Sequence, residues 1–281
     1  MAPRALSVSA LPAAARFAAA ALRALSRASF PLLLIALLRA SDPPLTPAVL
    51  ARALFALALL PELCARLILR AFAAPCQIEA GVLQIPSTLR RFEVPCSALT
   101  RVALLRLPLP SPGLSLVLRS GERLDIALCA RDPAPLLEAL ASAGVATPPA
   151  HDAARAFADA RASCPHRWWD RDLVRIGLAS LVPGAIAFNA HQHIAFGGTF
   201  GEYYLMGLRA WLASAAGYWF TAALYLVLWA GCFRFALETL AWLGACAAPL
   251  RARGLRRAGE RSAAAVYYLS VPLLLALRFL G

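Results

Sequence analysis

Long apolar runs, separated by short segments that carry arginines, dominate the pattern of the chain. Two runs lie near the amino terminus, at about residues 28–38 and 48–69, and three lie in the carboxy-terminal part, at about residues 173–188, 210–233 and 262–280. A helix that crosses a bilayer needs about 20 predominantly apolar residues. The pattern therefore predicts an α-helical polytopic membrane protein with about five transmembrane helices.

The first two runs leave two interpretations open. Residues 28–38 are short for a span, and the arginines beside them would have to extend toward the lipid headgroups. The second run is interrupted by Glu62 and Arg66, which are four residues apart and can pair on one face of a helix. Residues 1–72 therefore form a transmembrane hairpin or, alternatively, two helices that lie in the membrane interface.

The middle of the chain has a different pattern, in which apolar and polar positions alternate as they do in half-buried strands. The predicted strands and the helix that follows them lie at residues 77–85, 90–95, 99–107, 114–118, 124–128 and 134–143. Turn residues at 79–81 and 120–122 predict two hairpins, and Gly144 is expected to end the helix. This region therefore predicts a small antiparallel sheet or barrel capped by one helix.

Three segments of the region resemble the bacterial pleckstrin-homology-like (PH-like) domains that are found beside membrane helices. They are residues 78–83 (IEAGVL), 92–102 (FEVPCSALTRV) and 116–126 (LVLRSGERLDI). The resemblance implies a PH-like fold over about residues 76–145 and a role in interaction or assembly. It implies no catalytic residues, because the family is not known by a common catalytic set.

These patterns divide the chain into four predicted regions. An amino-terminal transmembrane hairpin (1–72) precedes the inserted PH-like β domain (76–145). A linker with an interfacial anchor (146–171) contains Trp168 and Trp169, and a three-helix membrane domain (172–281) contains a loop at residues 189–209. Paired tryptophans before an apolar run are typical of membrane–water interfaces.

Composition and charge agree with a membrane location. Of the 281 residues 60% are hydrophobic and 15% charged, and the net charge of +13 comes from 28 basic residues that are all arginine. Arginines crowd before the first apolar run and at residues 251–261, whereas residues 40–47 and 189–208 contain none. This asymmetry fits the positive-inside rule better than nucleic-acid binding. The amino terminus and the β domain are thus predicted to be cytoplasmic.

The composition also bears on origin and redox state. The chain lacks lysine and is rich in alanine and arginine, which suggests a GC-rich bacterial genome and a multi-pass protein of the bacterial inner (plasma) membrane. Its seven cysteines include no C-x-x-C pair. They are therefore predicted to be reduced and mostly buried, and to form neither a disulfide framework nor a zinc site.

Candidate chemistry is concentrated between the third and fourth apolar runs. His191, His193 and Glu202 could act as acid–base groups or as three ligands of zinc or iron. Histidines two residues apart face the same side on a strand, but on a helix they point about 200° apart. The metal interpretation therefore requires a strand-like or irregular backbone here.

Other residues of the same stretch suit a ligand or a lipid headgroup. The candidates are Asn189, Gly197, Gly198, Tyr203 and Arg209. Glycines let a backbone approach a ligand closely, and an arginine can pair with a phosphate. The alternative is that the stretch is an interfacial turn between two spans.

Three functions follow from this sequence. The preferred hypothesis is a scaffold or regulatory subunit of a membrane complex, which needs no cofactor and has the lipid bilayer and other membrane proteins as partners. The first alternative is a membrane enzyme that acts on a lipid or amphiphile through His191, His193 and Glu202. The second is a transport subunit, although the apolar runs carry few charges for a coupled pump.

Overall fold

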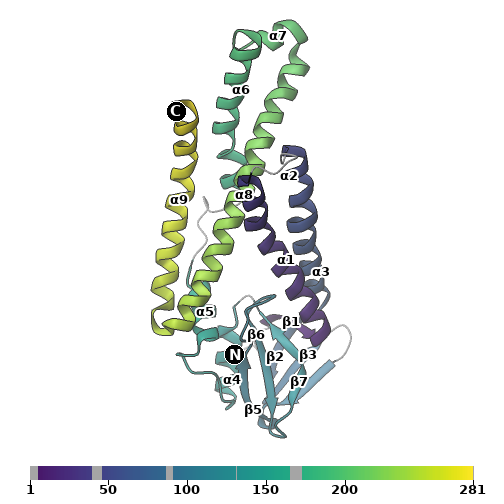
Figure 1. Ribbon diagram of the computed structural model, residues 1–281. Helices are drawn as coiled ribbons and strands as arrows, with labels where there is room; N and C mark the ends of the chain where they lie inside the picture. Colours follow the sequence, from purple (N-terminus) through teal and green to yellow (C-terminus); the bar gives the residue numbers. More distant parts are fainter. Residues whose placement is uncertain (1–5, 40–45, 87–90, 131, 165–172, 281) are drawn as a thin grey trace. The chain divides into compact units, whose positions relative to one another are not determined.

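The computed structural model describes residues 6–39, 46–86, 91–130, 132–164 and 173–280 (Figure 1). The chain divides into two compact units. The first consists of Met1–Ala28, Ala56–Cys164 and Leu237–Gly259, and the second of Ser29–Phe55, Pro165–Ala236 and Glu260–Gly281. The predicted interfacial anchor at Trp168 and Trp169 lies outside the described residues.

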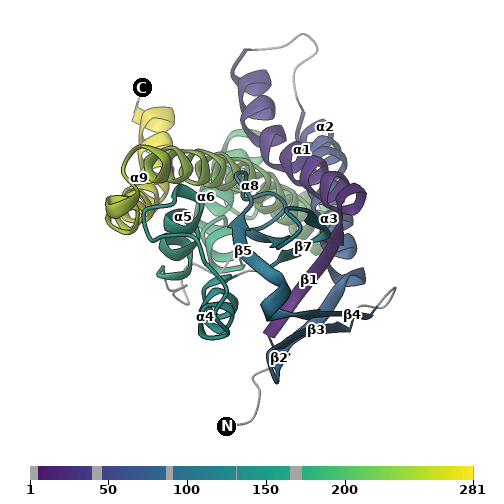
Figure 2. The same ribbon diagram turned by 90° about the horizontal axis from the view of Figure 1, so that it is seen from below.

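A seven-stranded antiparallel sheet is the centre of the first unit. Its strands, in spatial order, are β4 (Arg91–Pro95), β3 (Val82–Pro86), β2 (Ala73–Glu79), β1 (Leu6–Pro12), β7 (Arg123–Cys129), β6 (Gly113–Leu118) and β5 (Leu99–Leu104). The central strand is β1, which pairs with β2 on one side and with β7 on the other (Figure 2). The two halves of the sheet are therefore joined through the amino-terminal end of the chain.

Both predicted hairpins are confirmed. In the β2–β3 hairpin Glu79 pairs with Val82, and Ala80 and Gly81 between them have φ values of 50° and 78°. Two consecutive residues with positive φ make the tight turn whose twist matches that of paired strands. Strands β6 and β7 form the second hairpin, whose turn contains Gly121 at φ 85°.

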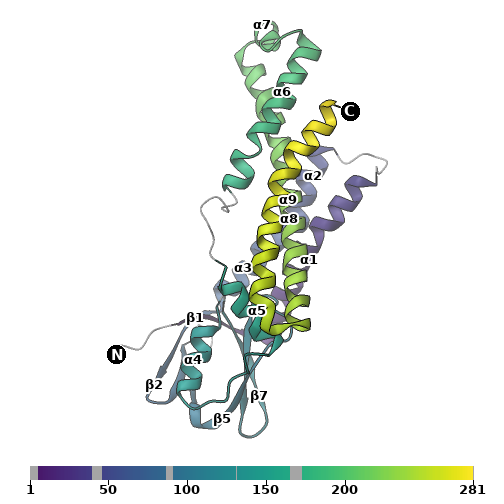
Figure 3. The same ribbon diagram turned by 90° about the vertical axis from the view of Figure 1, so that its left-hand side faces the viewer.

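One hydrophobic core lies between the sheet and helix α4 (Ala134–Ser142). Strands of both halves of the sheet contribute fully buried side chains, so the sheet must curve around a common centre; they include Leu83, Ile85, Leu114, Leu116 and Leu128. Helix α4 lies against the strands and adds Leu136, Leu137 and Leu140 (Figure 3). The predicted helix at 134–143 is confirmed, and Gly144 follows its end at φ 83°.

Two apolar helices are inserted between the first two strands of the sheet. Strand β1 runs directly into α1 (Ala13–Leu38). The chain returns through α2 (Pro47–Ala53), the π-helical turn η1 (Leu54–Leu59) and α3 (Leu60–Ala71), and then enters β2. Pro47 at the first helical position and the Thr46 hydroxyl, which accepts a hydrogen bond from Val49 N at 3.4 Å, define the start of α2.

The prediction of a small PH-like domain inserted at residues 76–145 is wrong. The sheet is larger than such a domain: it has seven strands, begins at Leu6 and includes β1, which comes from the region predicted to be only membrane hairpin. The error arose because β1 is short and adjoins a long apolar helix. The helices are inserted into the sheet, and the sheet is not an insertion between helices.

The remaining helices follow the sheet. They are α5 (Ala153–Ala162), the π-helical turn η4 (Leu173–Leu178), α6 (Leu181–Phe196), α7 (Gly201–Met206), α8 (Leu208–Ala247), the 3-10 turn η5 (Pro249–Arg251) and α9 (Ala252–Leu280). Asp152 starts α5, because its carboxylate accepts a hydrogen bond from Arg155 N at 3.0 Å. Part of the predicted linker is thus a packed helix, since Ala156, Phe157 and Ala160 are buried.

The prediction of about five transmembrane helices is also wrong. Within the described residues three helical segments are long and apolar enough to cross a membrane, by length and composition: Ala13–Leu38, Pro47–Ala71 and Leu208–Ala247. The predicted third span is divided between η4 and the 16-residue helix α6, which is shorter than the roughly 20 residues that a bilayer requires. Helix α9, over the predicted fifth span, begins with an arginine-rich segment and is not among the three.

Candidate functional site

The predicted site lies at a helical turn in the second unit. Helix α6 ends at Gly197, whose φ of 73° is the left-handed conformation that commonly follows a helix. Helix α7 follows, and α8 then runs back alongside α6. We call this turn, with the end of α6, α7 and the start of α8, the α6–α8 tip. His191 and His193 both lie on α6, so their side chains diverge around the helix axis.

The two histidines contact different residues. The His191 ring lies 5.3 Å from the ring of Tyr218 and 5.8 Å from that of Phe196, measured between centroids. The His193 Nε2 atom is 3.2 Å from the Thr199 hydroxyl. Among the described residues no group of three or more histidine, cysteine, aspartate or glutamate side chains could hold a metal ion. The structure thus gives the zinc or iron interpretation no support.

Glu202 is buried and fully engaged in hydrogen bonds. Its side chain is 5% exposed, and its carboxylate accepts hydrogen bonds from Gln192 Nε2 at 2.5 Å and from Ser214 Oγ at 2.6 Å. The Glu202 backbone N–H donates to Gln192 Oε1 at 3.3 Å. Gln192 itself has no exposed surface. We call these three residues the tip cluster; it connects α6, α7 and α8, and it shields an acidic group that would otherwise face an apolar surface.

Gln192 and Ser214 were not identified from the sequence. They lie ten residues before and twelve residues after Glu202, on two other helices, so no local periodicity relates them. The available signal was an amide side chain within an uncharged run, because a buried amide needs hydrogen-bond partners. That signal predicts a polar contact but does not indicate which residue is the partner.

The predicted ligand or headgroup residues take up separate positions. Asn189 and Arg209 are exposed on α6 and α8, and Gly197 and Gly198 belong to the turn after α6. Tyr203 is 41% exposed, and its ring lies 5.3 Å from that of Tyr204. Two cavities lie among the described residues of the first unit, and neither is lined by these residues or by the histidines.

Aromatic packing holds the α6–α8 tip together. The Phe188 ring packs edge-on against that of Trp211, with the centroids 5.2 Å apart, and the Phe200 ring stacks on Trp211 at 5.8 Å. The Trp211 indole N–H donates to the Thr199 carbonyl at 3.2 Å. These contacts make the tip an ordered helical turn.

A charged cluster in the first unit joins α1 to α3 near the sheet. The predicted pair of Glu62 and Arg66 is confirmed, with Arg66 Nε 2.8 Å from Glu62 Oε1. Arg23 of α1 completes the cluster, since its Nε lies 3.4 Å from Glu62 Oε2. The Arg23 guanidinium also donates to the Pro110 carbonyl between β5 and β6. One arginine therefore contacts both helices of the hairpin and a loop of the sheet.

Two hydrogen bonds reinforce the connection between the strands and the helices. Ser9 Oγ in β1 donates to the Leu69 carbonyl in α3 at 2.9 Å, and Ala10 N donates to the Phe72 carbonyl at 2.9 Å. Ser26 Oγ in α1 donates to the Ala58 carbonyl at 2.8 Å, and this contact is buried. Hydrogen bonds thus connect α3 to β1 and α1 to η1.

A second charged cluster joins the end of α8 to the start of α9 and to α5. Arg256 and Glu238 form a buried ion pair, 2.8 Å between Nη2 and Oε1, with the side chains 2% and 9% exposed. The Arg256 guanidinium lies over the Phe157 ring at 5.8 Å, and the Phe157 ring packs edge-on against Trp242 at 5.5 Å. A buried charge is stable only when it is paired in this manner.

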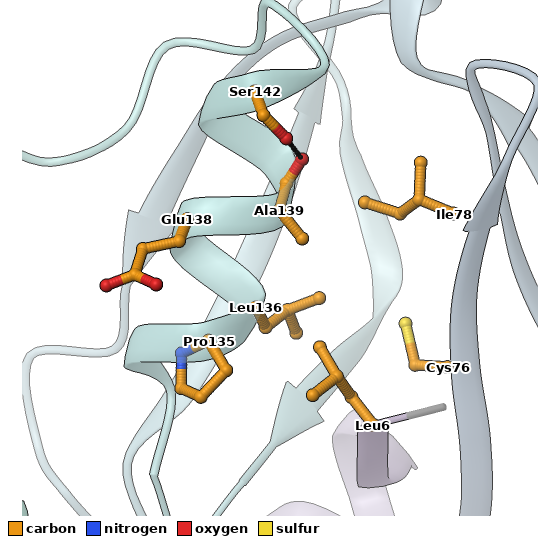
Figure 4. Close-up of a pocket in the computed structure, with 8 residues that line it drawn as sticks. All are labelled: Leu6, Cys76, Ile78, Pro135, Leu136, Glu138, Ala139 and Ser142. Atoms are coloured by element: carbon orange, nitrogen blue, oxygen red, sulfur yellow. Dashed lines mark hydrogen bonds between the residues drawn. The ribbon is translucent and has the colours of Figure 1, made fainter. Parts of the chain in front are cut away.

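A cavity of about 370 Å³ lies between α4 and strands β1 and β2. Leu6, Cys76 and Ile78 face Leu136 and Ala139 across it, and the Glu138 carboxylate points away (Figure 4). Burial raises the pKa of the Cys76 thiol to about 11. The cavity is thus lined mainly by apolar groups and an unreactive thiol, and it lacks the convergent polar groups of a catalytic site.

Comparison of the chain with protein-family models, with curated proteins and with solved structures finds no match. The PH-like resemblance over residues 76–145 therefore has no support beyond the segments that suggested it.

Proposed function

We propose that the protein is an integral membrane scaffold or regulatory subunit of a membrane complex, with the seven-stranded sheet as its interaction module. The observation that carries the proposal is the direct continuity of β1 with α1 and of α3 with β2. Two segments that are able to cross a membrane therefore begin and end on adjacent strands of one sheet.

The contacts at this junction favour a mechanical role. Arg23 holds Glu62 and the Pro110 carbonyl, Ser9 adds a hydrogen bond between β1 and α3, and Ser26 adds one between the two helical segments. Because side chains and backbone groups from both sides take part, a shift of α1 or α3 in the membrane would move the sheet with it. A scaffold or a regulatory subunit needs this coupling, whereas a domain on a flexible linker would lack it.

The arginine distribution supports an orientation for this proposal. Arginines precede the first apolar run and crowd residues 251–261, and residues 189–208 contain none. By the positive-inside rule the sheet module and residues 251–261 are cytoplasmic. The lysine-free composition fits a bacterial inner membrane.

Site-specific photo-crosslinking in intact cells tests the scaffold proposal. A photoreactive residue in place of Arg101 or Arg123, which are exposed on β5 and β7, is expected to give a discrete adduct with another membrane protein. Breaking the junction with Arg23→Gln/Glu62→Gln should reduce the adduct. The matched variant Arg119→Gln/Glu122→Gln changes the same charges on the exposed β6–β7 turn and should leave it unchanged.

A monomeric protein without a crosslinked partner would contradict the scaffold proposal. The proposal fails if neither position gives an adduct and the solubilised protein has the size of one 29.9 kDa chain in its detergent or lipid shell. Extraction of the protein from membranes by alkaline carbonate would contradict its integral character. Either result can be read without knowing the partner.

One observation favours a membrane enzyme as the second candidate. The half-buried Ser214 hydroxyl donates to the Glu202 carboxylate at 2.6 Å, which is the contact that a base makes with a serine nucleophile. A fluorophosphonate probe would label such a serine. Labelling that disappears in both Ser214→Ala and Glu202→Gln would replace the scaffold proposal by a hydrolase acting on lipids or amphiphiles, whereas absence of labelling removes this candidate.

A further inference from the structure

Helix α3 presents leucines and arginines together on one exposed face. The residues of this face are spaced three and four apart along the helix: Leu63, Arg66, Leu67 and Arg70. At about 3.6 residues per turn they fall within an arc of about 100°. The leucines are 50% and 54% exposed, the Arg66 side chain is 63% exposed, and Arg70 is exposed. Ala65, on the opposite side of the helix, has no exposed surface. We call the four exposed residues the α3 face.

The α3 face carries more positive charge than its neighbouring carboxylate balances. Glu62 is shared by two arginines, with Arg66 Nε 2.8 Å and Arg23 Nε 3.4 Å from its oxygens. In the part of the chain that the structure describes, this bond from Nε is the one contact of the Arg66 guanidinium, and Arg70 has no ion-pair or hydrogen-bond partner. The Nη groups of Arg66 and the whole guanidinium of Arg70 are therefore available to an anion.

The sheet determines where this face meets the membrane surface. Ser9 Oγ in β1 donates to the Leu69 carbonyl at 2.9 Å, so the last turn of α3 is attached to the sheet. Strands β4 and β5 are the two ends of the described sheet, and such edges do not lie in hydrocarbon, where their backbone groups would lack hydrogen-bond partners. Arg70 is thus near the water side of the bilayer, and Arg66 lies about 6 Å further along the axis. Because a headgroup layer is about 5–8 Å thick, both guanidiniums fit within it.

An anionic phospholipid matches both the charge and the apolar part of this face. The segment Pro47–Ala71, which contains α3, is long and apolar enough to cross a bilayer, so acyl chains are the expected cover of Leu63. A guanidinium binds phosphate oxygens through paired N–H donors, and arginines beside a membrane attract anionic lipids. An acidic protein would have to enter the headgroup layer to contact both Arg66 and Leu63. The position of the face therefore favours a lipid over a protein partner.

We propose that the α3 face binds the headgroup of an anionic phospholipid in the leaflet next to the sheet. This inference rests on the proposed membrane scaffold and adds a lipid ligand to it. Arg66 and Arg70 hold the phosphate, and the two leucines contact the acyl chains. Arg66 also binds Glu62, which Arg23 connects to the Pro110 carbonyl of the sheet module. A bound lipid therefore stabilises the junction between the helices and the sheet.

Native mass spectrometry of the full chain tests the inference. The protein in detergent is titrated with dioleoylphosphatidylglycerol, which is anionic, and separately with dioleoylphosphatidylcholine, which is zwitterionic. We expect the first phosphatidylglycerol molecule to bind at least about fivefold more tightly than phosphatidylcholine. Glycerol 3-phosphate, which has the phosphate but no acyl chains, should not displace it at an equal concentration.

Variants of the two arginines show whether the preference comes from this face. Arg66→Gln/Arg70→Gln should weaken binding of phosphatidylglycerol about 5- to 25-fold and leave that of phosphatidylcholine unchanged. Arg70→Gln alone, which removes no contact among the described residues, should still weaken it about fivefold. The matched control Arg119→Gln/Arg123→Gln removes two exposed arginines near the β6–β7 turn and should have no effect.

Four outcomes would overturn the inference. They are equal affinity for the two lipids, unchanged affinity in both arginine variants, an equal loss in the control, and displacement of the lipid by glycerol 3-phosphate. A photoreactive residue in place of Leu67 should form an adduct of lipid mass, and a protein adduct there would also overturn it. If the adduct at Arg101 or Arg123 persists while the lipid preference is absent, the scaffold function stands and only the lipid site is rejected.

Discussion

Loss of the buried ion pair between Glu238 and Arg256 should strongly destabilise the first unit. The pair joins the end of α8 to the start of α9, its atoms are 2.8 Å apart, and both side chains are almost completely buried. We consider Glu238→Leu. This change removes the Glu238 carboxylate from the buried Arg256 guanidinium, and a guanidinium does not lose its proton to escape the cost.

The expected magnitude follows from that burial. Removing one partner of a buried ion pair costs about 3–5 kcal/mol. The contact of the Arg256 guanidinium with the Phe157 ring recovers only part of this, because such contacts contribute about 0.5–2 kcal/mol and already exist in the wild type. A loss of this size should lower the thermal midpoint by on the order of 10 °C.

Buried cysteines in the same unit provide the assay. Cys76, Cys96 and Cys129 are buried in the sheet, and a maleimide dye that fluoresces on reaction reports when heating exposes them. Cys246 is exposed and is replaced by serine in every variant. Glu122→Leu, at an exposed turn of the sheet, is the control and should shift the midpoint by less than about 2 °C.

The double variant Glu238→Leu/Arg256→Met tests whether the remaining charge of Arg256 causes the loss of stability. Because it removes both charges together, it should recover most of the midpoint lost in Glu238→Leu. The reasoning is refuted if Glu238→Leu unfolds at the same temperature as the Glu122→Leu control. It is also refuted if the double variant is less stable than the single one, since the charge of Arg256 would then not be the cause.

Three further predictions concern packing, thiol reactivity and the dependence of stability on pH. Gly184→Ala should destabilise the packing of α6 against α8 by about 1–3 kcal/mol, because its Cβ would lie 2.9 Å from Trp219 Cα. Gly217→Ala, with nothing within 4 Å, should not destabilise it. Thermal unfolding followed by tryptophan fluorescence compares the two variants. In the native protein at pH 8, Cys76, whose pKa burial raises to about 11, should react with maleimide far more slowly than the exposed Cys246, as peptide mass spectrometry after timed labelling would show. Because the folded state keeps the Cys76 proton longer than the unfolded state, its contribution to stability is complete below about pH 9 and is lost as the pH rises toward 11. Equal labelling rates or a clashing but stable Gly184→Ala would contradict these predictions.

The elements that the sequence predicted well are those determined by neighbouring residues. The hairpin at Ala80–Gly81 depends on two adjacent residues that adopt positive φ, and α4 depends on a local apolar pattern ended by Gly144. The Glu62–Arg66 pair needs only one turn of helix to form. In each case the whole cause lies within a few residues, so a local pattern suffices.

The misplaced elements depend on distant partners. Strand β1 is seven residues long, and its pairing residues lie more than 60 positions away in β2 and more than 110 away in β7. Nothing beside Leu6–Pro12 distinguishes it from the start of the apolar helix that follows. The predicted PH-like domain was too small for this reason.

At the candidate site the sequence identified the helical turn but not its chemistry. His191, His193 and Glu202 are close along the chain, yet α6 turns the two histidines apart and Glu202 binds Gln192 and Ser214. Side chains on three helices meet only when the helices pack. The predicted metal centre required a non-helical backbone, and the helix removes that geometry.

The sequence by itself determined that much of this chain is apolar enough for a bilayer, that arginine is distributed unevenly along it, and that its middle forms hairpins. Only the tertiary structure decided that two helices apolar enough to cross a membrane are inserted into a seven-stranded sheet, and that Arg23 and Arg256 are held by acids on other helices. The physical reason is the separation along the chain over which each interaction acts. Periodicity, turns and composition act between neighbours, whereas strand pairing, buried ion pairs and uncovered surfaces depend on which distant segments meet in space.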